Sequence, residues 1–218
     1  MMTGIEVSRA DGRDVETVSR IIAEAFFELP PSRWLVPDEG WRRAIYARFF
    51  RLAYVEPGLA TGAVYLTADR LAAAIWLHLD PDESPGPDQS PGPDRGHGPD
   101  PAADAAIQEL TGPFHKNFAE FDRLLAEAHE PYLDRPHDFL AVLGAHPVVW
   151  RQGSGKALLK HHHRILDRIG RGAYLEAATP ELVGYYRPFG YAPTDAVITL
   201  PNGATMHPMW REPRAGDP

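Results

Sequence analysis

The segment from Phe139 to Gly170 constrains the fold more than any other part of the chain. Its first part, Phe139 to Ala145, is an apolar run with the length of a buried strand, and Ser154 to Ile169 has the apolar spacing of a helix that Gly170 closes. A glycine-rich turn, Trp150 to Gly155, joins the two. Several backbone amides without helical partners therefore meet at one point, and the helix dipole adds partial positive charge there. Such a turn is typical of a binding site for a phosphate or a pyrophosphate.

Gly153 and Gly155 are compatible with three kinds of phosphate-binding loop. A dinucleotide-binding fingerprint requires a third glycine at the position of Leu158. A loop for nucleoside triphosphates requires glycine at the position of Trp150 and a magnesium-binding hydroxyl at that of Ala157. Both readings lack residues that their chemistry needs, and magnesium-dependent ATP binding would reveal the second. The third pattern, Arg/Gln-x-x-Gly-x-Gly/Ala, is that of acyl-CoA pyrophosphate loops, and the two glycines match it.

Composition excludes several classes of function. The 30 acidic residues outnumber the 22 basic ones, which gives a net charge of −8, so neither nucleic acid nor an anionic membrane is an expected partner. The chain has no cysteine, which excludes disulfides, thiolate metal sites and cysteine nucleophiles. Met1 to Ala10 lacks the basic and apolar blocks of a signal peptide, and no apolar run approaches the roughly 20 residues of a membrane span. We therefore expect a cytoplasmic protein.

The periodicity of the rest predicts one domain, residues 1–218, in the order β-α-α-β-β-α-β-α-β-α-β-β. This order indicates the α/β (α+β) class, a mixed sheet with helices on both faces. We expect strands at Ile5–Ser8, Ala60–Thr67, Leu71–Leu79, Phe139–Ala145, Tyr174–Ala178, Ala192–Leu200 and Thr205–Arg211. We expect helices at Val15–Leu29 (capped by Asp11, stopped by Pro30-Pro31), Trp41–Tyr54, Ala102–Leu110, Phe114–Ala128, Ser154–Ile169 and Glu181–Arg187, with a turn at Pro57-Gly58. Residues 80–101 hold seven prolines and four glycines, so they predict a flexible surface insertion.

The chain resembles the GNAT acetyltransferases, and among them the puromycin N-acetyltransferase type. Three pieces carry the likeness: Phe139–Pro147, the glycine loop followed by Ala157-Leu158-Leu159, and Tyr174–Ala178 followed by Tyr185–Tyr191. Trp150 stands where the family has its leading Arg or Gln, and Arg151 lies beside it.

The resemblance implies a GNAT-like, mostly antiparallel mixed sheet flanked by helices, whose strands four and five splay apart. It also implies acetyl-CoA as cosubstrate and no metal. The pantetheine arm would enter the gap and pair with the backbone of Leu143, Gly144 and Ala145. The pyrophosphate would be held by the loop residues Arg151, Gln152, Gly153, Ser154, Gly155 and Lys156. The element Tyr-x-x-x-Gly-Tyr would place Tyr186 near the thioester sulfur to protonate the leaving thiolate, unless that tyrosine is structural.

The sequence leaves the general base and the acceptor pocket open. Glu176 either deprotonates the acceptor ammonium from strand five or is a solvent-facing strand carboxylate, and His146 is a second candidate. Trp34 and Trp76 are predicted to wall an apolar substrate pocket, although aromatic residues at helical spacing are more often core. The run His161–His163 predicts no metal site, because consecutive helical residues point about 100° apart and cannot converge on one ion. We expect these histidines on the helix surface.

These features predict an acetyl-CoA-dependent N-acetyltransferase that acts on the primary amine of a small molecule. Antibiotics and aminonucleosides are among the candidate acceptors. The alternative is a non-catalytic acyl-CoA-binding sensor, because Trp150 replaces the leading Arg/Gln and no base stands out. The expected partner is a small-molecule amine, and the chain itself is expected to be a monomer or a homodimer.

Overall fold

A mixed sheet of eight strands organises the structure, which is a computed structural model describing residues 4–81 and 101–214. The insertion predicted at residues 80–101 lies almost wholly outside the described residues. The strand order is β1-β2-β3-β4-β5-β8-β6, with β7 also pairing with β8. Neighbouring strands are antiparallel except β4 and β5, which are parallel. The strands are β1 (Val7–Arg9), β2 (Ala63–Thr67), β3 (Ala72–Leu79), β4 (His137–Ala145), β5 (Gly172–Ala177), β6 (Ala192–Pro193), β7 (Ile198–Thr199) and β8 (Thr205–Arg211).

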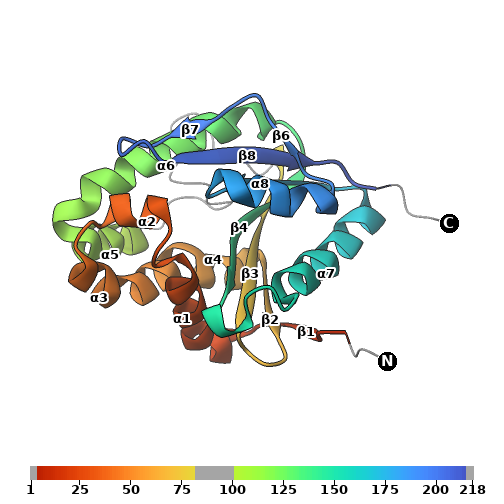
Figure 1. Ribbon diagram of the computed structural model, residues 1–218, viewed down its shortest axis with the longest axis horizontal. Helices are drawn as coiled ribbons and strands as arrows, with labels where there is room; N and C mark the ends of the chain where they lie inside the picture. The colour runs from red at the N-terminus through yellow and green to blue at the C-terminus, as the bar shows by residue number, and fades with distance from the viewer. Residues whose placement is uncertain (1–3, 82–100, 215–218) are drawn as a thin grey trace.

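Helices cover both faces of this sheet, as expected. They are α1 (Val15–Phe26), α2 (Pro30–Leu35), α3 (Glu39–Phe50), α4 (Glu56–Thr61), α5 (Pro101–Thr111), α6 (His115–His129), α7 (Ser154–Ile169) and α8 (Pro180–Tyr186). Figure 1 shows α1, α3 and α5 to the left of the strands and α7 to their right. In the same view β8 runs across the direction of β3 and β4, because the sheet is strongly twisted. Within the described residues, no helix combines the length and the apolar character that crossing a membrane requires.

The proline signals in the N-terminal half were partly misinterpreted. Pro30 does not simply stop a helix: α1 ends at Phe26, and Pro30 opens α2, where a missing amide hydrogen costs nothing. Pro57 likewise lies in the first turn of α4, so the predicted turn at Pro57-Gly58 is wrong. Gly58 has a packing reason instead, since a Cβ there would lie 2.6 Å from Cγ2 of Ile75. The helix that follows α2 is α3, and it continues into a π-helical turn, Arg51–Val55.

Alternation along β3 divides its side chains between two core clusters. Ala73, Ile75 and Leu77 pack with the N-terminal helices, whereas Trp76 packs on the opposite face with α7. β4 carries a bulge at Ala141, because Ile75 pairs with Val142 while Trp76 pairs with Leu140. The bulge lies where β4 begins to separate from β5, so it helps to direct the second half of β4 away from its parallel neighbour.

Buried histidines tie α7 to the sheet, which corrects the prediction that His161–His163 lie on the surface. His162 and His163 are only 2% and 6% exposed, whereas His161 is half-buried. His162 Nε2 lies 2.7 Å from Asp138 Oδ2, and His163 Nε2 lies 3.1 Å from the hydroxyl of Tyr191. The polarity of histidine suggested solvent, but these partners on β4 and on the segment before β6 satisfy the ring nitrogens inside the protein.

We expect the free energy of unfolding to fall as the pH drops from 7.5 to 5.5. Burial lowers the pKa of His137 to about 4 and the pKa of His163 to about 3. In the unfolded chain both titrate near 6.5. Between these values the unfolded chain binds more protons, so acid favours unfolding, by about 1 kcal/mol per histidine at pH 5.5. Urea unfolding at the two pH values measures the difference.

A matched variant isolates one of the two groups. His163→Gln keeps a hydrogen-bonding partner for Tyr191 but cannot take up a proton, so it should remove the contribution of His163 to this pH dependence, about 1 kcal/mol at pH 5.5. Asp138 does not contribute to the change: burial raises the pKa of its carboxyl, but hydrogen bonds from His162 and His78 outweigh that and hold the pKa well below its usual range. An unchanged slope in the variant would contradict the assignment to His163.

Candidate functional site

The parallel strands β4 and β5 separate soon after they begin. Their ladder consists of the pairs His137–Gly172, Asp138–Ala173 and Phe139–Tyr174, all at the start of both strands. Beyond these pairs, and within the part of the chain that the structure describes, β4 bonds only to β3 and β5 only to β8. The predicted splay of strands four and five is therefore confirmed. Backbone groups of β4 that face β5 along its second half have no strand partner there.

A cavity of about 430 Å³ opens along this separation. One end is formed by β4, β5 and α8, and includes Leu143, Glu176 and Tyr186. The other end reaches between α1, α2, α3 and α6, where apolar and aromatic side chains dominate. Its size lies within the range of about 300–1,000 Å³ that small-ligand pockets have. The cavity thus connects the gap in the sheet with the N-terminal helices.

The start of α7 presents unpaired amides, and Trp150, in the loop that leads into this helix, lines the cavity. Gly153 is the N-cap with φ of 96°, a left-handed conformation that glycine adopts without strain, and no side chain caps the helix. Within the described residues, the backbone amides of Ser154, Gly155 and Lys156 have no hydrogen-bond acceptor. The first amide with one is that of Ala157, which donates to the carbonyl of Gly153. Free amides at the positive end of a 16-residue helix suit an anion.

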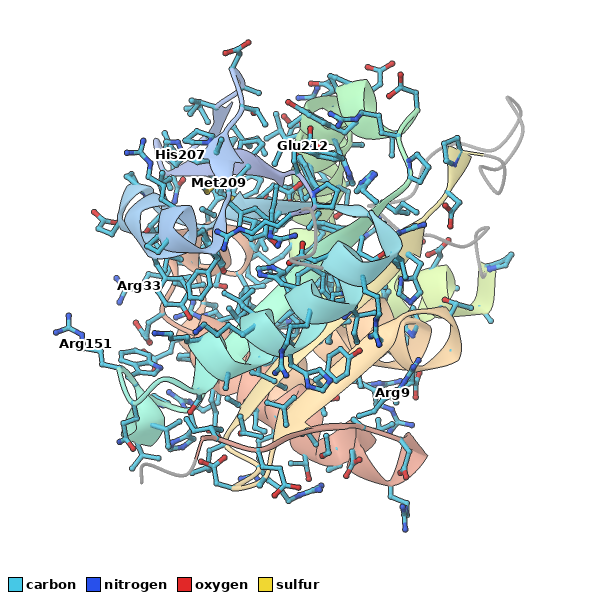
Figure 2. The ribbon with its side chains drawn as sticks, turned by 90° about the vertical axis from the view of Figure 1, so that its right-hand side faces the viewer. Arg9, Arg33, Arg151, His207, Met209 and Glu212 are labelled. Atoms are coloured by element: carbon cyan, nitrogen blue, oxygen red, sulfur yellow. The ribbon has the colours of Figure 1, made fainter. Side chains whose placement is uncertain are left out.

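The loop side chains that were predicted to hold the pyrophosphate point in different directions. Arg151 lies at the tip with φ of 61°, and Figure 2 shows its side chain projecting away from the protein. Gln152 turns back on the loop, where its Nε2 donates to the carbonyl of Val148. Lys156 is exposed on the first turn of α7. Arg151 and Lys156 are thus both exposed, and neither has an ion-pair partner among the described residues.

Trp150 takes a position of its own at the rim of the cavity. Its indole Nε1 donates to the carbonyl of Ala145 at 2.8 Å, while 58% of the residue remains exposed. This bond fixes the loop to the end of β4. The indole ring also lines the cavity, and it stands at the position where the family pattern has Arg or Gln.

Tyr186 lines the cavity from the end of α8. It is 8% exposed, and burial raises the pKa of its phenol above the usual value, so the group stays protonated at neutral pH. The neighbouring Tyr185 points elsewhere: a Cβ on Gly155 would lie 2.6 Å from Tyr185 Oη. Burial raises the pKa of Tyr185 to about 12. Of these two neighbouring tyrosines, Tyr186 lines the cavity, whereas Tyr185 packs α8 against the start of α7.

Glu176 also lines the cavity, from β5. Alternation puts it on the same face of β5 as Tyr174, which packs with the N-terminal helices, whereas Leu175 packs with α7. His146, the other candidate base, does not line the cavity. Its Nδ1 accepts from the amide of Val148, and its Nε2 lies 3.1 Å from a carboxylate oxygen of Glu24. Both ring nitrogens are therefore occupied outside the cavity.

Neither tryptophan that was predicted to bind the substrate lines the cavity. Trp76 is fully buried on the α7 face of the sheet, stacked on His162 with ring centroids 4.2 Å apart. Trp34 packs against Phe121 with centroids 6.3 Å apart and is absent from the cavity wall. The prediction took aromatic character as a sign of a pocket, whereas for Trp76 the face of β3 decides which side of the sheet the ring meets.

Other aromatic residues line the cavity instead of the two tryptophans. They come from α1, α3, the π-helical turn and α6: Phe26, Tyr46, Phe49, Phe50, Tyr54 and Phe121. The only available signal was the density of aromatic residues in these helices, and core residues produce the same signal. Their role at a cavity depends on the gap between β4 and β5, which a helical pattern does not reveal.

Comparisons with known proteins agree on the fold. No protein-family model matches the chain, and no curated protein matches it. A polyamine N-acetyltransferase from Drosophila melanogaster is similar in structure at 13% identity, covering 96% of this chain and 100% of that one, with a TM-score of 0.65. An agmatine N-acetyltransferase is similar at 14% identity, with coverage of 96% and 100% and a TM-score of 0.64. A histone acetyltransferase HPA2-related protein from Corynebacterium glutamicum is similar at 18% identity, with coverage of 99% and 100% and a TM-score of 0.59. The chain has the GNAT acetyltransferase fold.

Proposed function

We propose that the protein is an acetyl-CoA-dependent N-acetyltransferase that acts on the primary amine of a small molecule. The observation that carries the proposal is the presence of three features in one region: free amides at the start of α7, the separation of β4 from β5, and a cavity along that separation whose wall includes Trp150 of the loop before α7. An anion site beside an unpaired strand edge suits a ligand with a pyrophosphate and an amide-containing arm. The structural neighbours act on amines according to their names, which supports an amine acceptor. The sequence resemblance adds antibiotics and aminonucleosides as finer candidates.

The residues present fit the cosubstrate. The amides of Gly153, Ser154, Gly155 and Lys156, with the charges of Lys156 and Arg151, would hold the pyrophosphate, and Gln152 would stabilise the loop. The backbone of Leu143, Gly144 and Ala145 would bind the pantetheine arm. Bound there, acetyl-CoA supplies an acetyl group activated as a thioester.

Glu176 and Tyr186 have complementary roles in this proposal. Glu176 removes a proton from the acceptor ammonium, so that the neutral nitrogen forms a bond to the thioester carbonyl carbon while the carbon–sulfur bond breaks. Tyr186 gives its phenolic proton to the departing sulfur and regains one from the nitrogen, which leaves an amide and free coenzyme A. Binding both reactants in one cavity makes the attack intramolecular in effect. Glu176 faces the N-terminal helices and Tyr186 comes from α8, so the two groups belong to different walls of the cavity.

Acetyl-CoA titration of a charge-reversed loop tests the coenzyme site. Lys156→Glu should raise the dissociation constant by about 10-fold or more, because it replaces attraction by repulsion at the pyrophosphate. Lys160→Glu is the matched control: it makes the same change one turn further along α7, beyond the free amides, and should have a smaller effect. Isothermal titration calorimetry measures both.

Two outcomes of these measurements separate the alternatives. Equal affinities in the two variants, or no binding to the unchanged protein, would remove the coenzyme site. Binding without thiol release across a panel of amines would instead favour the non-catalytic sensor.

A further inference from the structure

The inner end of the cavity is the part that the coenzyme would not fill. It lies between α1, α2, α3 and α6. Its wall includes Phe26, Leu29, Leu35, Phe49, Phe50 and Phe121. Phe49 and Phe50 are themselves fixed by a cluster of rings, with centroids 5.4 Å apart from each other and 5.3 Å between Phe26 and Phe50. A rigid aromatic wall of this kind favours an apolar, flat or bulky body over a flexible polar chain.

The charged side chains that line the cavity, among the described residues, are all acidic. Among the described residues that line it, the ionisable ones other than tyrosine are Glu176 and Glu181, and none is a lysine, arginine or histidine. Both carboxylates belong to the end near β5 and α8. At the inner end the polar groups are hydroxyls, and that of Tyr46 already donates to the carbonyl of Ser32 at 3.1 Å. A carboxylate or phosphate on the ligand would meet no counter-charge, and a second cation at the inner end would meet no carboxylate.

We infer that the acceptor is a hydrophobic monoamine: one primary amine carried on an aryl or comparably bulky apolar body, with neither a carboxylate nor a second amine. The inference rests on the proposed acetyl transfer at this site. The amine meets Glu176 at the gap in the sheet, and the apolar body occupies the inner end. An amino acid would leave its carboxylate without a counter-charge, and a diamine that reaches the inner end would leave its second ammonium unpaired there, because both carboxylates lie on β5 and α8. A long acyl chain on the coenzyme is the competing occupant, but it would bring no charge to the two carboxylates.

A panel of three amines tests the inference: 2-phenylethylamine, L-phenylalanine (the same skeleton with a carboxylate) and 1,4-diaminobutane (a second amine in place of the ring). We expect kcat/KM for 2-phenylethylamine to exceed that of the other two by about 100-fold or more, because each of them buries an unpaired charge. Calorimetric titration of each amine into the protein saturated with coenzyme A gives binding independently of turnover. Octanoyl-CoA is compared with acetyl-CoA in the same assay.

A negative charge introduced at the inner end of the cavity should change which amine the protein prefers. Phe121→Glu gives 1,4-diaminobutane a partner, so its kcat/KM should rise by about 10-fold or more while that of 2-phenylethylamine falls. Phe121 is only half-buried, which favours folding of the variant. Leu124→Glu is the control: it puts the same charge on a half-buried position of α6 that does not line the cavity, and it should leave both values unchanged. Acetyl-CoA affinity confirms that each variant is folded.

The outcomes separate this inference from the proposed function. Selective binding of 2-phenylethylamine without turnover would overturn acetyl transfer and support the hydrophobic amine site. Acetylation with 1,4-diaminobutane or L-phenylalanine preferred would overturn the inference and leave acetyl transfer standing. The inference also fails if octanoyl-CoA is strongly preferred to acetyl-CoA, or if none of the three amines binds. If Phe121→Glu does not fold, the unchanged protein with the three amines decides.

Discussion

Tyr186→Phe should lower kcat for thiol release by about 100-fold or more and leave the acetyl-CoA dissociation constant within about twofold, because general acids contribute factors of this size to turnover. The change removes one hydroxyl from a buried position at the cavity wall and keeps the ring that packs in the α7-side core. The elevated pKa of Tyr186 means that the phenol is present as the proton-bearing form over the whole working range of pH. Steady-state thiol release and calorimetry give the two quantities.

Tyr191→Phe is the matched control for this experiment. Tyr191 is also buried, at 3% exposure, with its ring centroid 5.8 Å from that of Tyr186, but it does not line the cavity. Its hydroxyl bonds to His163, so Tyr191→Phe should cost about 1 kcal/mol of stability and leave kcat unchanged. Equal losses of kcat in both variants would point to a general loosening of the core. An unchanged kcat in Tyr186→Phe would remove the tyrosine from the mechanism.

The elements that the sequence encodes locally were predicted well. The strand, the glycine turn and the helix from residues 139 to 170 need only their own residues, since Gly153 and Gly170 adopt the left-handed conformations that begin and end α7. The splay of β4 and β5 followed from the family resemblance and is confirmed by their short ladder. Local chemistry and a shared fold were thus enough to locate the gap and the loop.

What the sequence did not reveal depends on contacts between distant segments. Trp76 is directed away from the cavity because alternation along β3 puts it on the α7 face, and no local pattern says which face is which. The bulge at Ala141 changes which side chains of β4 meet each face, and it leaves no signature in an apolar run. His162 was interpreted as a surface residue because its partner, Asp138, lies 24 positions earlier and is brought near only by the packing of α7 on the sheet.

Asp138 is the centre of a buried polar network that includes His162 and that the sequence did not reveal. The carboxylate is 1% exposed, and Arg171 Nε donates to its Oδ1 at 2.6 Å. Its Oδ2 lies 2.7 Å from His162 Nε2 and 2.9 Å from His78 Nδ1. Burial lowers the pKa of His162 despite the carboxylate, so the contact is a hydrogen bond from a neutral ring, and Arg171 is the charged partner. The other ring nitrogen of His162 lies 3.3 Å from the hydroxyl of Tyr65, which extends the network to β2.

Asp138→Asn should lower the free energy of unfolding by about 3–5 kcal/mol, because it removes the buried counter-charge of Arg171 and turns one acceptor into a donor that faces a donor. For a chain of this size the melting temperature should fall by roughly 10 °C. Urea and thermal unfolding followed by circular dichroism measure both, with Asp195→Asn, an exposed position between β6 and β7, as a control expected to stay within about 0.5 kcal/mol. A loss of unfolding free energy below about 1 kcal/mol would show that water or a local rearrangement compensates for the lost ion pair and hydrogen bonds. Because Asp138 does not line the cavity, acetyl-CoA affinity measured well below the melting temperature should be unchanged, which separates a structural role from one in the site.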